Sequence, residues 1–177
     1  MTVPLTTARL RTAFNLPWLL CVSGLVFLLS QTLLGLAFAP LGGPDTLLRI
    51  QLGFTSAEAY QAQFQAWDEA GLLGVYQAHF LLDALHPFWY AILGTCALAI
   101  VFSWRGASAV WDRLLPLPML SGLLDVMENS VQRVFLAEPL LITDGLARLS
   151  WLCSLGKWTL VMVYVLAVLY WLLPLRR

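Results

Sequence analysis

The sequence predicts an all-α integral membrane protein, a four-transmembrane-helix bundle with cytoplasmic termini and a short amphipathic helix in the outer loop between the first two spans. The composition is one reason, because the 177 residues are 60% hydrophobic and 11% charged, whereas soluble domains are about 25% charged. Segment length is another, since four apolar stretches reach the roughly 20 residues that a membrane span needs. The placement of arginines beside these stretches is the third. We expect a single domain over residues 1–177.

The first span is predicted at residues 16–38. Arg9 and Arg11 precede it, and the small residues of segment 37–39 could be taken for a signal-peptide cleavage motif. The apolar run is, however, much longer than the roughly 7–15 residues of a signal peptide. This length favours an uncleaved transmembrane helix.

An amphipathic helix is predicted at residues 56–69, after a stretch rich in Gly and Pro. Tyr60, Phe64 and Trp67 recur there at helical spacing and form an aromatic stripe. The stripe suits a helix that lies at the membrane surface, and it equally suits a helix packed on the protein's own outer face. We expect segment 57–67 to cover the polar residues described below.

Three further spans are predicted at residues 72–102, 114–136 and 146–173. The first of these is long and contains Pro87, which should kink it because proline lacks an N–H and clashes with the preceding turn.

The orientation follows from the arginines, which mark cytoplasmic flanks. They lie in the N-terminal segment, the second connection and the C-terminal segment: Arg9, Arg11, Arg105, Arg113, Arg176 and Arg177. The first and third connections carry more acidic than basic residues. We therefore expect cytoplasmic termini, an external amphipathic helix, and a location in the plasma (inner) membrane of a bacterium.

Polar side chains interrupt the apolar spans at spacings of three and four, which places them on one face of each helix. The second span carries Tyr76, His79, Asp83, His86 and Tyr90. The third carries Asp125, Glu128, Asn129 and Gln132, and the fourth carries Ser150, Cys153, Ser154, Lys157 and Tyr164. The first span contributes Gln31.

These polar faces should meet at one level of the membrane. At 1.5 Å per residue, Gln31, Asp83, Glu128 and Lys157 each lie about 12–17 Å below the predicted outer surface. A charged side chain facing lipid at the bilayer centre costs about 2.5–3.5 kcal/mol, so these groups should face one another inside the bundle. Lys157 should neutralise only one of the three acids, which leaves two carboxyl groups for chemistry or binding.

Our leading hypothesis is a membrane-embedded enzyme that isomerises, cyclises or hydrolyses a lipid, sterol or isoprenoid-like substrate by acid–base chemistry, because burial separates the pKa values of neighbouring carboxyls. The candidate catalytic residues are Asp83, Asp125, Glu128, Lys157 and His86. The candidate substrate-binding residues are Gln31, Tyr76, Tyr90, Asn129, Gln132, Trp67 and Tyr164.

A metal site is the second hypothesis, since His and carboxylate ligands suit zinc, iron or manganese. The candidate ligands of this divalent metal are His79, Asp83, His86 and Glu128.

A third hypothesis is non-enzymatic. The chain would then be a receptor for a lipid or small lipophilic molecule, or a subunit of a homo-oligomer or larger membrane complex. The net charge of zero gives no indication of nucleic-acid binding. Cys21, Cys96 and Cys153 fall in different spans and are expected to be buried free thiols.

The layout of four helices with acids and a histidine inside the bundle resembles that of emopamil-binding-type membrane proteins, which include sterol isomerases and ligand receptors. The resemblance is one of architecture and carries no assignment of residues. It implies a lipophilic substrate or ligand.

Overall fold

The computed structural model describes residues 5–173, and this range contains helices and no strands. Arg176 and Arg177, two of the arginines from which we predicted the orientation in the membrane, lie outside the described residues. The α-helices are α1 (Leu5–Phe14), α2 (Pro17–Phe38), α3 (Gly43–Gly53), α4 (Ala57–Glu69), α5 (Leu73–Asp83), α6 (His86–Trp104), α7 (Leu117–Ala137) and α8 (Asp144–Leu172). Short 3-10 turns lie at Ala39–Leu41, Ala109–Leu114 and Pro139–Leu141.

Within residues 5–173, three helical segments are long and apolar enough to cross a membrane: Pro17–Leu41, His86–Trp104 and Asp144–Leu172. The all-helical fold is thus confirmed, and the three candidate spans indicate a membrane protein. The 21-residue α7 has the length of a span, but it carries Asp125, Glu128 and Arg133, and such residues lower its hydropathy.

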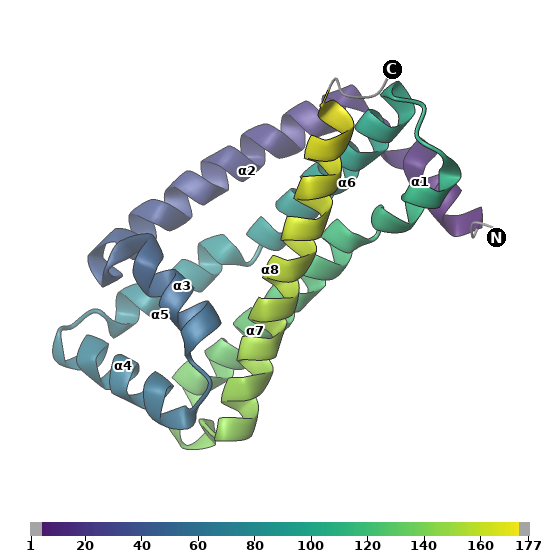
Figure 1. Cartoon of the computed structure of the whole chain (residues 1–177). Coiled ribbons are helices and arrows are strands. Elements are labelled where there is room, and N and C mark those ends of the chain that lie inside the picture. Colours follow the sequence, from purple (N-terminus) through teal and green to yellow (C-terminus); the bar gives the residue numbers. More distant parts are fainter. Residues whose placement is uncertain (1–4, 174–177) are drawn as a thin grey trace.

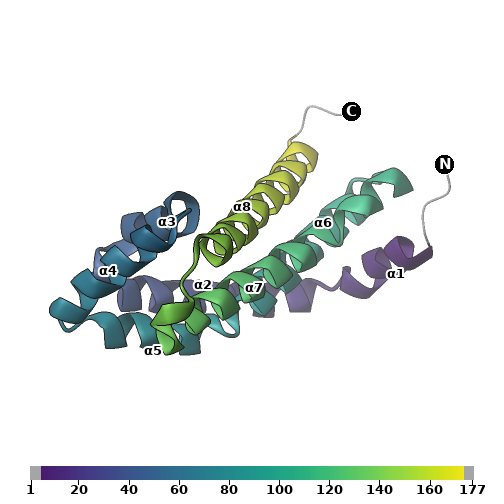
Figure 2. The same cartoon turned by 90° about the horizontal axis from the view of Figure 1, so that it is seen from below.

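The helices are arranged around α6, which packs against α2, α7 and α8. Helix α7 lies alongside α8, whereas α2 lies on another side of α6 and diverges from α8 (Figure 1). Helix α1 and the C-terminal end of α8 lie at the same end of the molecule, the termini end, and α3 and α4 lie at the opposite end, the α4 end (Figures 1 and 2). The termini end and the α4 end are therefore the two poles of the bundle.

The predicted span 72–102 is two helices, α5 and α6, separated by Ala84 and Leu85. A continuous helix would need a backbone N–H at position 87 to bond the carbonyl of Asp83, and proline has none. Helix α5 therefore ends at Asp83, and Pro87 lies in the first turn of α6, where it is tolerated.

Helices α1 and α3 were not predicted. The stretch rich in Gly and Pro that follows the first span begins α3. Gly42 and Gly43 adopt positive φ values of 102° and 70°, and Pro44 lies in the first turn of the helix. This turn folds the chain back, so that α3 packs against both α2 and α8.

Helix α4 packs its aromatic stripe against the protein itself. Tyr60, Phe64 and Trp67 are buried, and they belong to an apolar cluster that also contains Tyr76 and Phe135. A second apolar cluster around Leu98, Phe102 and Trp171 fills the termini end. The polar residues of α7 and α8 lie along these helices between the two clusters.

Candidate functional site

An ion cluster joins α7 to α8. The Lys157 Nζ lies 2.8 Å from Asp125 Oδ1 and 2.7 Å from Glu128 Oε2. All three side chains are almost fully buried. Asp125 and Glu128 are three residues apart and therefore share a face of α7. Lys157 thus contacts two of the three predicted acids, where the sequence had suggested one.

The remaining carboxylate oxygens of this cluster also have hydrogen-bond donors. The Tyr90 hydroxyl donates to Asp125 Oδ2 at 3.1 Å, and Gln132 Nε2 donates to Glu128 Oε1 at 3.1 Å. Every oxygen of the two carboxylates therefore has a partner, which holds both groups in fixed positions.

Gln132 connects the ion cluster to the α4 end. It accepts a hydrogen bond from Tyr76 Oη at 2.6 Å and lies 3.2 Å from Ser150 Oγ, to which its Nε2 donates. The Tyr60 hydroxyl lies 3.1 Å from the same Ser150 oxygen. Burial raises the pKa of Tyr60 to about 12, so this hydroxyl keeps its proton at neutral pH.

Asp83 is the acid that stands apart. Its Oδ2 accepts a hydrogen bond from Asn129 Nδ2 at 2.7 Å, and the ion pairs found among residues 5–173 do not include it. A neutral amide compensates a carboxylate charge much less than an ammonium does. Asp83 therefore differs in environment from Asp125 and Glu128.

The two histidines differ in their partners. His86 Nδ1 lies 2.7 Å from Ser30 Oγ of α2, and its ring stacks on Phe27 with centroids 5.3 Å apart. His79 Nδ1 contacts the backbone oxygen of Tyr76 within α5. His86 therefore fastens α6 to α2, whereas His79 is held by its own helix.

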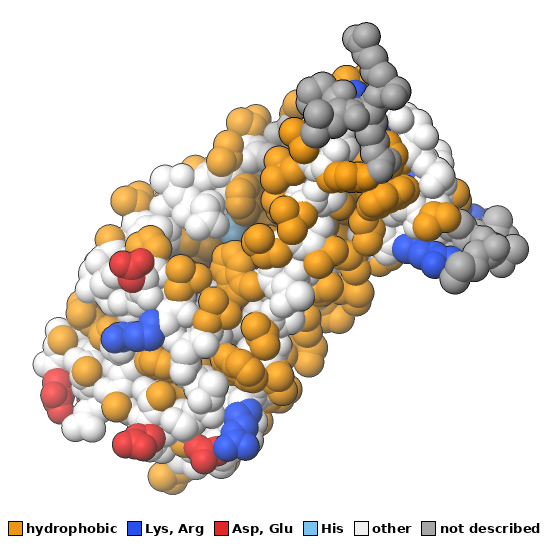
Figure 3. Space-filling model, in the orientation of Figure 1, with side chains coloured by type: hydrophobic (Ala, Val, Ile, Leu, Met, Phe, Trp, Pro, Cys, Tyr) orange, Lys and Arg blue, Asp and Glu red, His pale blue; other side chains and the backbone are white. Residues whose placement is uncertain are grey.

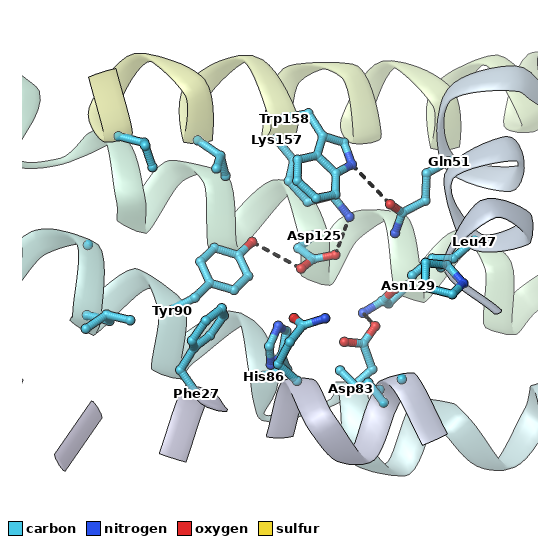
Figure 4. Close-up of a pocket in the computed structure, with 18 of the residues that line it drawn as sticks. Phe27, Leu47, Gln51, Asp83, His86, Tyr90, Asp125, Asn129, Lys157 and Trp158 are labelled. Carbon is cyan, nitrogen blue, oxygen red and sulfur yellow. Dashed lines mark hydrogen bonds and ion pairs between the residues drawn. The ribbon is translucent and has the colours of Figure 1, made fainter. Parts of the chain in front are cut away.

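A cavity of about 440 Å³ lies beside the ion cluster. Side chains of α2 and α8 form two of its walls, and Gln31 and Lys157 are among them. Helices α5, α6 and α7 supply most of the other polar groups, and Leu47 and Gln51 of α3 line the cavity at the α4 end. In Figure 3 a histidine is visible in a recess of this face, among hydrophobic side chains. Figure 4 shows Asp83, His86, Tyr90 and Asp125 around the same space.

Most of the predicted site residues line this cavity. They are Gln31, His79, Asp83, His86, Tyr90, Asp125, Asn129, Gln132, Lys157 and Tyr164. Three do not: Glu128 lies behind Lys157, Tyr76 lies behind Gln132, and Trp67 belongs to the apolar cluster at the α4 end.

The cover of the cavity also differs from the prediction. No residue of segment 57–67 lines it, because the aromatic stripe of α4 is occupied by its own cluster. Helix α3 takes this place, and Trp158 Nε1 of α8 donates to Gln51 Oε1 at 3.0 Å. Gln51 and Trp158 were missed, although Leu47, Gln51 and Phe54 have helical spacing that could have indicated α3.

The predicted metal ligands are not assembled as a donor set. No group of three or more His, Cys, Asp or Glu side chains within residues 5–173 could hold a metal ion. His79 and His86 use Nδ1 for other partners, and Glu128 faces the Lys157 cation. The arrangement therefore gives no support to a metal site formed by His79, Asp83, His86 and Glu128. Cys21, Cys96 and Cys153 are free thiols, and Cys96 and Cys153 are buried as predicted, whereas Cys21 of α2 is exposed.

No protein-family model matches the chain, and comparisons with curated proteins and with solved structures found no match.

Proposed function

We propose that the chain is a membrane-embedded enzyme that performs acid–base chemistry on a lipophilic substrate. One observation carries the proposal: a mostly apolar cavity, walled by two of the membrane-spanning helices, contains Asp83, His86 and Asp125 together. Ligand sites usually combine apolar walls with a few convergent polar groups. Ionisable groups at membrane depth are costly and mark functional sites by default.

The proposed topology has four spans. In chain order they are α2, then α5 and α6 together, then α7, and last α8. The inward placement of the α7 acids supports this, because Asp125 and Glu128 are buried against α8. The N-terminal segment and the second connection, both at the termini end, carry Arg9, Arg11, Arg105 and Arg113. The acids visible in Figure 3 lie at the opposite end, where basic side chains are also visible. On the positive-inside rule, we propose that the termini end lies in the cytoplasm of a bacterial cell and that the site lies toward the outer leaflet of its inner membrane.

The three acids would have different roles because their environments differ. Asp125 and Glu128 share the Lys157 ammonium as an ion-pair partner. Asp83 has only the Asn129 amide, so it is the carboxyl best suited to take up and release a proton. Two carboxyls in contrasting environments are the usual basis for an acid and a base in one site.

His86 is the second candidate for proton transfer. The Ser30 hydroxyl has a single proton, which it can donate to the carbonyl of Phe27, 3.0 Å away. In that arrangement Ser30 Oγ accepts from His86 Nδ1, and the Nε2 atom then carries the lone pair. His86 would thus act as a base toward a substrate in the cavity.

The substrate would enter from the lipid between α2 and α8. Both helices line the cavity, with Leu34 on one side and Val161 and Val165 on the other. A lipid, sterol or isoprenoid-like molecule could move sideways into this space without crossing water.

Isotope uptake from solvent tests the proposal with a mixture of lipids, so the substrate need not be chosen in advance. The purified protein in nanodiscs is incubated with a total bacterial lipid extract in D₂O or in H₂¹⁸O, and the lipids are analysed by mass spectrometry. Isomerisation or cyclisation introduces deuterium, and hydrolysis introduces ¹⁸O. We expect one lipid class to gain mass with the wild type and to lose this gain with Asp83→Asn and His86→Gln. Asp68→Asn, on the exposed part of α4, is the matched control.

The same experiment separates the enzyme from a receptor. A lipid that co-purifies with the protein but shows no solvent isotope, in the wild type or in any variant, would contradict the enzymatic proposal and favour a lipid receptor. An equal isotope gain in the wild type and Asp83→Asn would contradict the role of Asp83.

A further inference from the structure

A second cavity, of about 160 Å³, adjoins the first. It forms where the break between α5 and α6 faces α7, and Ala84, Phe88, Val126 and Arg133 are among its lining residues. Two residues, Asp83 and Asn129, line both cavities. These two are joined by the 2.7 Å hydrogen bond. The bonded pair therefore forms part of the partition between the cavities.

The two cavities differ in their lining. The larger one is walled mainly by apolar residues of α2 and α8, whereas half of the residues that line the smaller one are polar, and two of these, Ser130 and Arg133, are exposed. Arg133 is four residues from the end of α7 at Ala137, about 6 Å along the helix axis. Its long side chain can extend from there to the aqueous surface. The lining of the smaller cavity thus runs from Asp83 to Arg133, the lining residue nearest the end of α7.

We propose that the smaller cavity is a water inlet through which Asp83 exchanges protons while a lipophilic substrate fills the larger cavity. The proposal rests on the proposed function. When Asp83 acts as an acid, its O–H bond breaks and the proton passes to the substrate. The carboxylate then takes a proton from hydronium in the inlet, which leaves water. When Asp83 acts as a base, the same steps run in reverse.

Labelling of Asp83 by two carbodiimides tests the inlet. A water-soluble cationic carbodiimide should reach Asp83 through the smaller cavity, and lipid-soluble dicyclohexylcarbodiimide should reach it through the larger one. Ser130→Phe fills the smaller cavity. Gly35→Phe fills the larger one, at a position where an added Cβ meets no atom within 4 Å. The protein is labelled in nanodiscs, and each site is quantified by peptide mass spectrometry.

The expected result is a crossed pattern. Ser130→Phe slows labelling of Asp83 by the water-soluble reagent at least tenfold and leaves dicyclohexylcarbodiimide labelling within twofold, whereas Gly35→Phe does the opposite. Ala84→Phe, which fills the smaller cavity from the other wall, should act like Ser130→Phe and protects the test against one misfolded variant. Asp68 should react with the water-soluble reagent in every variant and serves as the internal control.

Two results would overturn the inlet. In the first, Gly35→Phe slows the labelling of Asp83 by the water-soluble reagent, whereas Ser130→Phe and Ala84→Phe do not. The other is an Asp83 that stays unlabelled while Asp68 reacts. Labelling needs no substrate, so failure of the isotope experiment with an intact crossed pattern would reject the enzyme and keep the inlet.

Discussion

Lys157 Nζ and Glu128 Oε2 are 2.7 Å apart, yet only Lys157 lines the cavity. Glu128 therefore holds the Lys157 ammonium from the side away from the cavity. The lysine charge then faces the cavity, next to Asp125. This relationship makes Glu128 a positioning residue, and it makes the ion cluster as important for the fold as for the site.

Lys157→Met should strongly destabilise the protein. The change leaves two buried carboxylates without their cation, and breaking a buried ion pair by removing one partner costs about 3–5 kcal/mol. Thermal unfolding in detergent measures the loss. Adding Glu128→Gln to Lys157→Met removes one of the stranded charges and should recover part of it. Thr159→Ala, at an exposed position of α8, is the control. Equal destabilisation by Lys157→Met and Thr159→Ala would contradict this account.

Asp83→Asn should abolish chemistry and preserve the fold. Acid–base groups contribute about 10²- to 10⁴-fold to rates, so isotope uptake by lipid should fall at least about 100-fold. The melting temperature should change little, because Asp83 has the neutral Asn129 as its hydrogen-bond partner and no ion pair.

Asp125→Asn is the informative comparison for Asp83→Asn. It disturbs the contacts to both Lys157 and Tyr90, so it should lower the melting temperature as well as the activity. Equal thermal destabilisation by the two substitutions would show that Asp83 and Asp125 share one structural role.

The sequence predicts the facing of the polar residues well, because side chains at spacings of three and four must share a helix face. That rule alone directs Asp125, Glu128 and Lys157 inward, and the structure brings the three into contact. It does not predict which acids share the lysine, since one helical turn of error in depth is about as large as the separation between neighbouring acids on α7.

The missed features depend on tertiary contacts. Pro87 could have kinked a continuous helix or ended one, and the choice depends on what satisfies the backbone near Asp83. Gly42 and Gly43 are equally compatible with an open loop and with the tight turn that directs α3 onto α2 and α8. The sequence therefore predicts the aromatic stripe of α4 as the cover of the cavity, whereas in the structure Gln51 of α3 lines it.

Gly122→Ala should push α7 away from α6. A Cβ at Gly122 would lie 2.9 Å from the carbonyl oxygen of Pro87 and 3.3 Å from the Cβ of Ala91, and backbone cannot yield as a flexible side chain can. Overpacking of this kind costs about 1–3 kcal/mol, which thermal unfolding detects. Gly74→Ala on α5 meets no atom within 4 Å and should be neutral or stabilising, so equal destabilisation by the two changes would contradict a close α6–α7 contact.

Tyr60 should make the fold sensitive to alkaline pH. Burial raises its pKa from 10.0 to about 12, so the folded protein keeps the phenol proton at a pH where the unfolded chain has lost it. The stabilisation from neutral Tyr60 is therefore complete below pH 10 and is progressively lost as the pH rises from 10 to 12.

Tyr60→Phe should be less stable at neutral pH, because it loses the hydroxyl that contacts Ser150. The stability that this variant loses between pH 10 and 12 should nevertheless be smaller than the stability that the wild type loses. Thermal unfolding of both proteins across this range isolates Tyr60 from the other buried tyrosines, since they contribute equally to the two curves. Parallel curves would mean that water reaches the Tyr60 hydroxyl and that α4 is not firmly packed on the bundle.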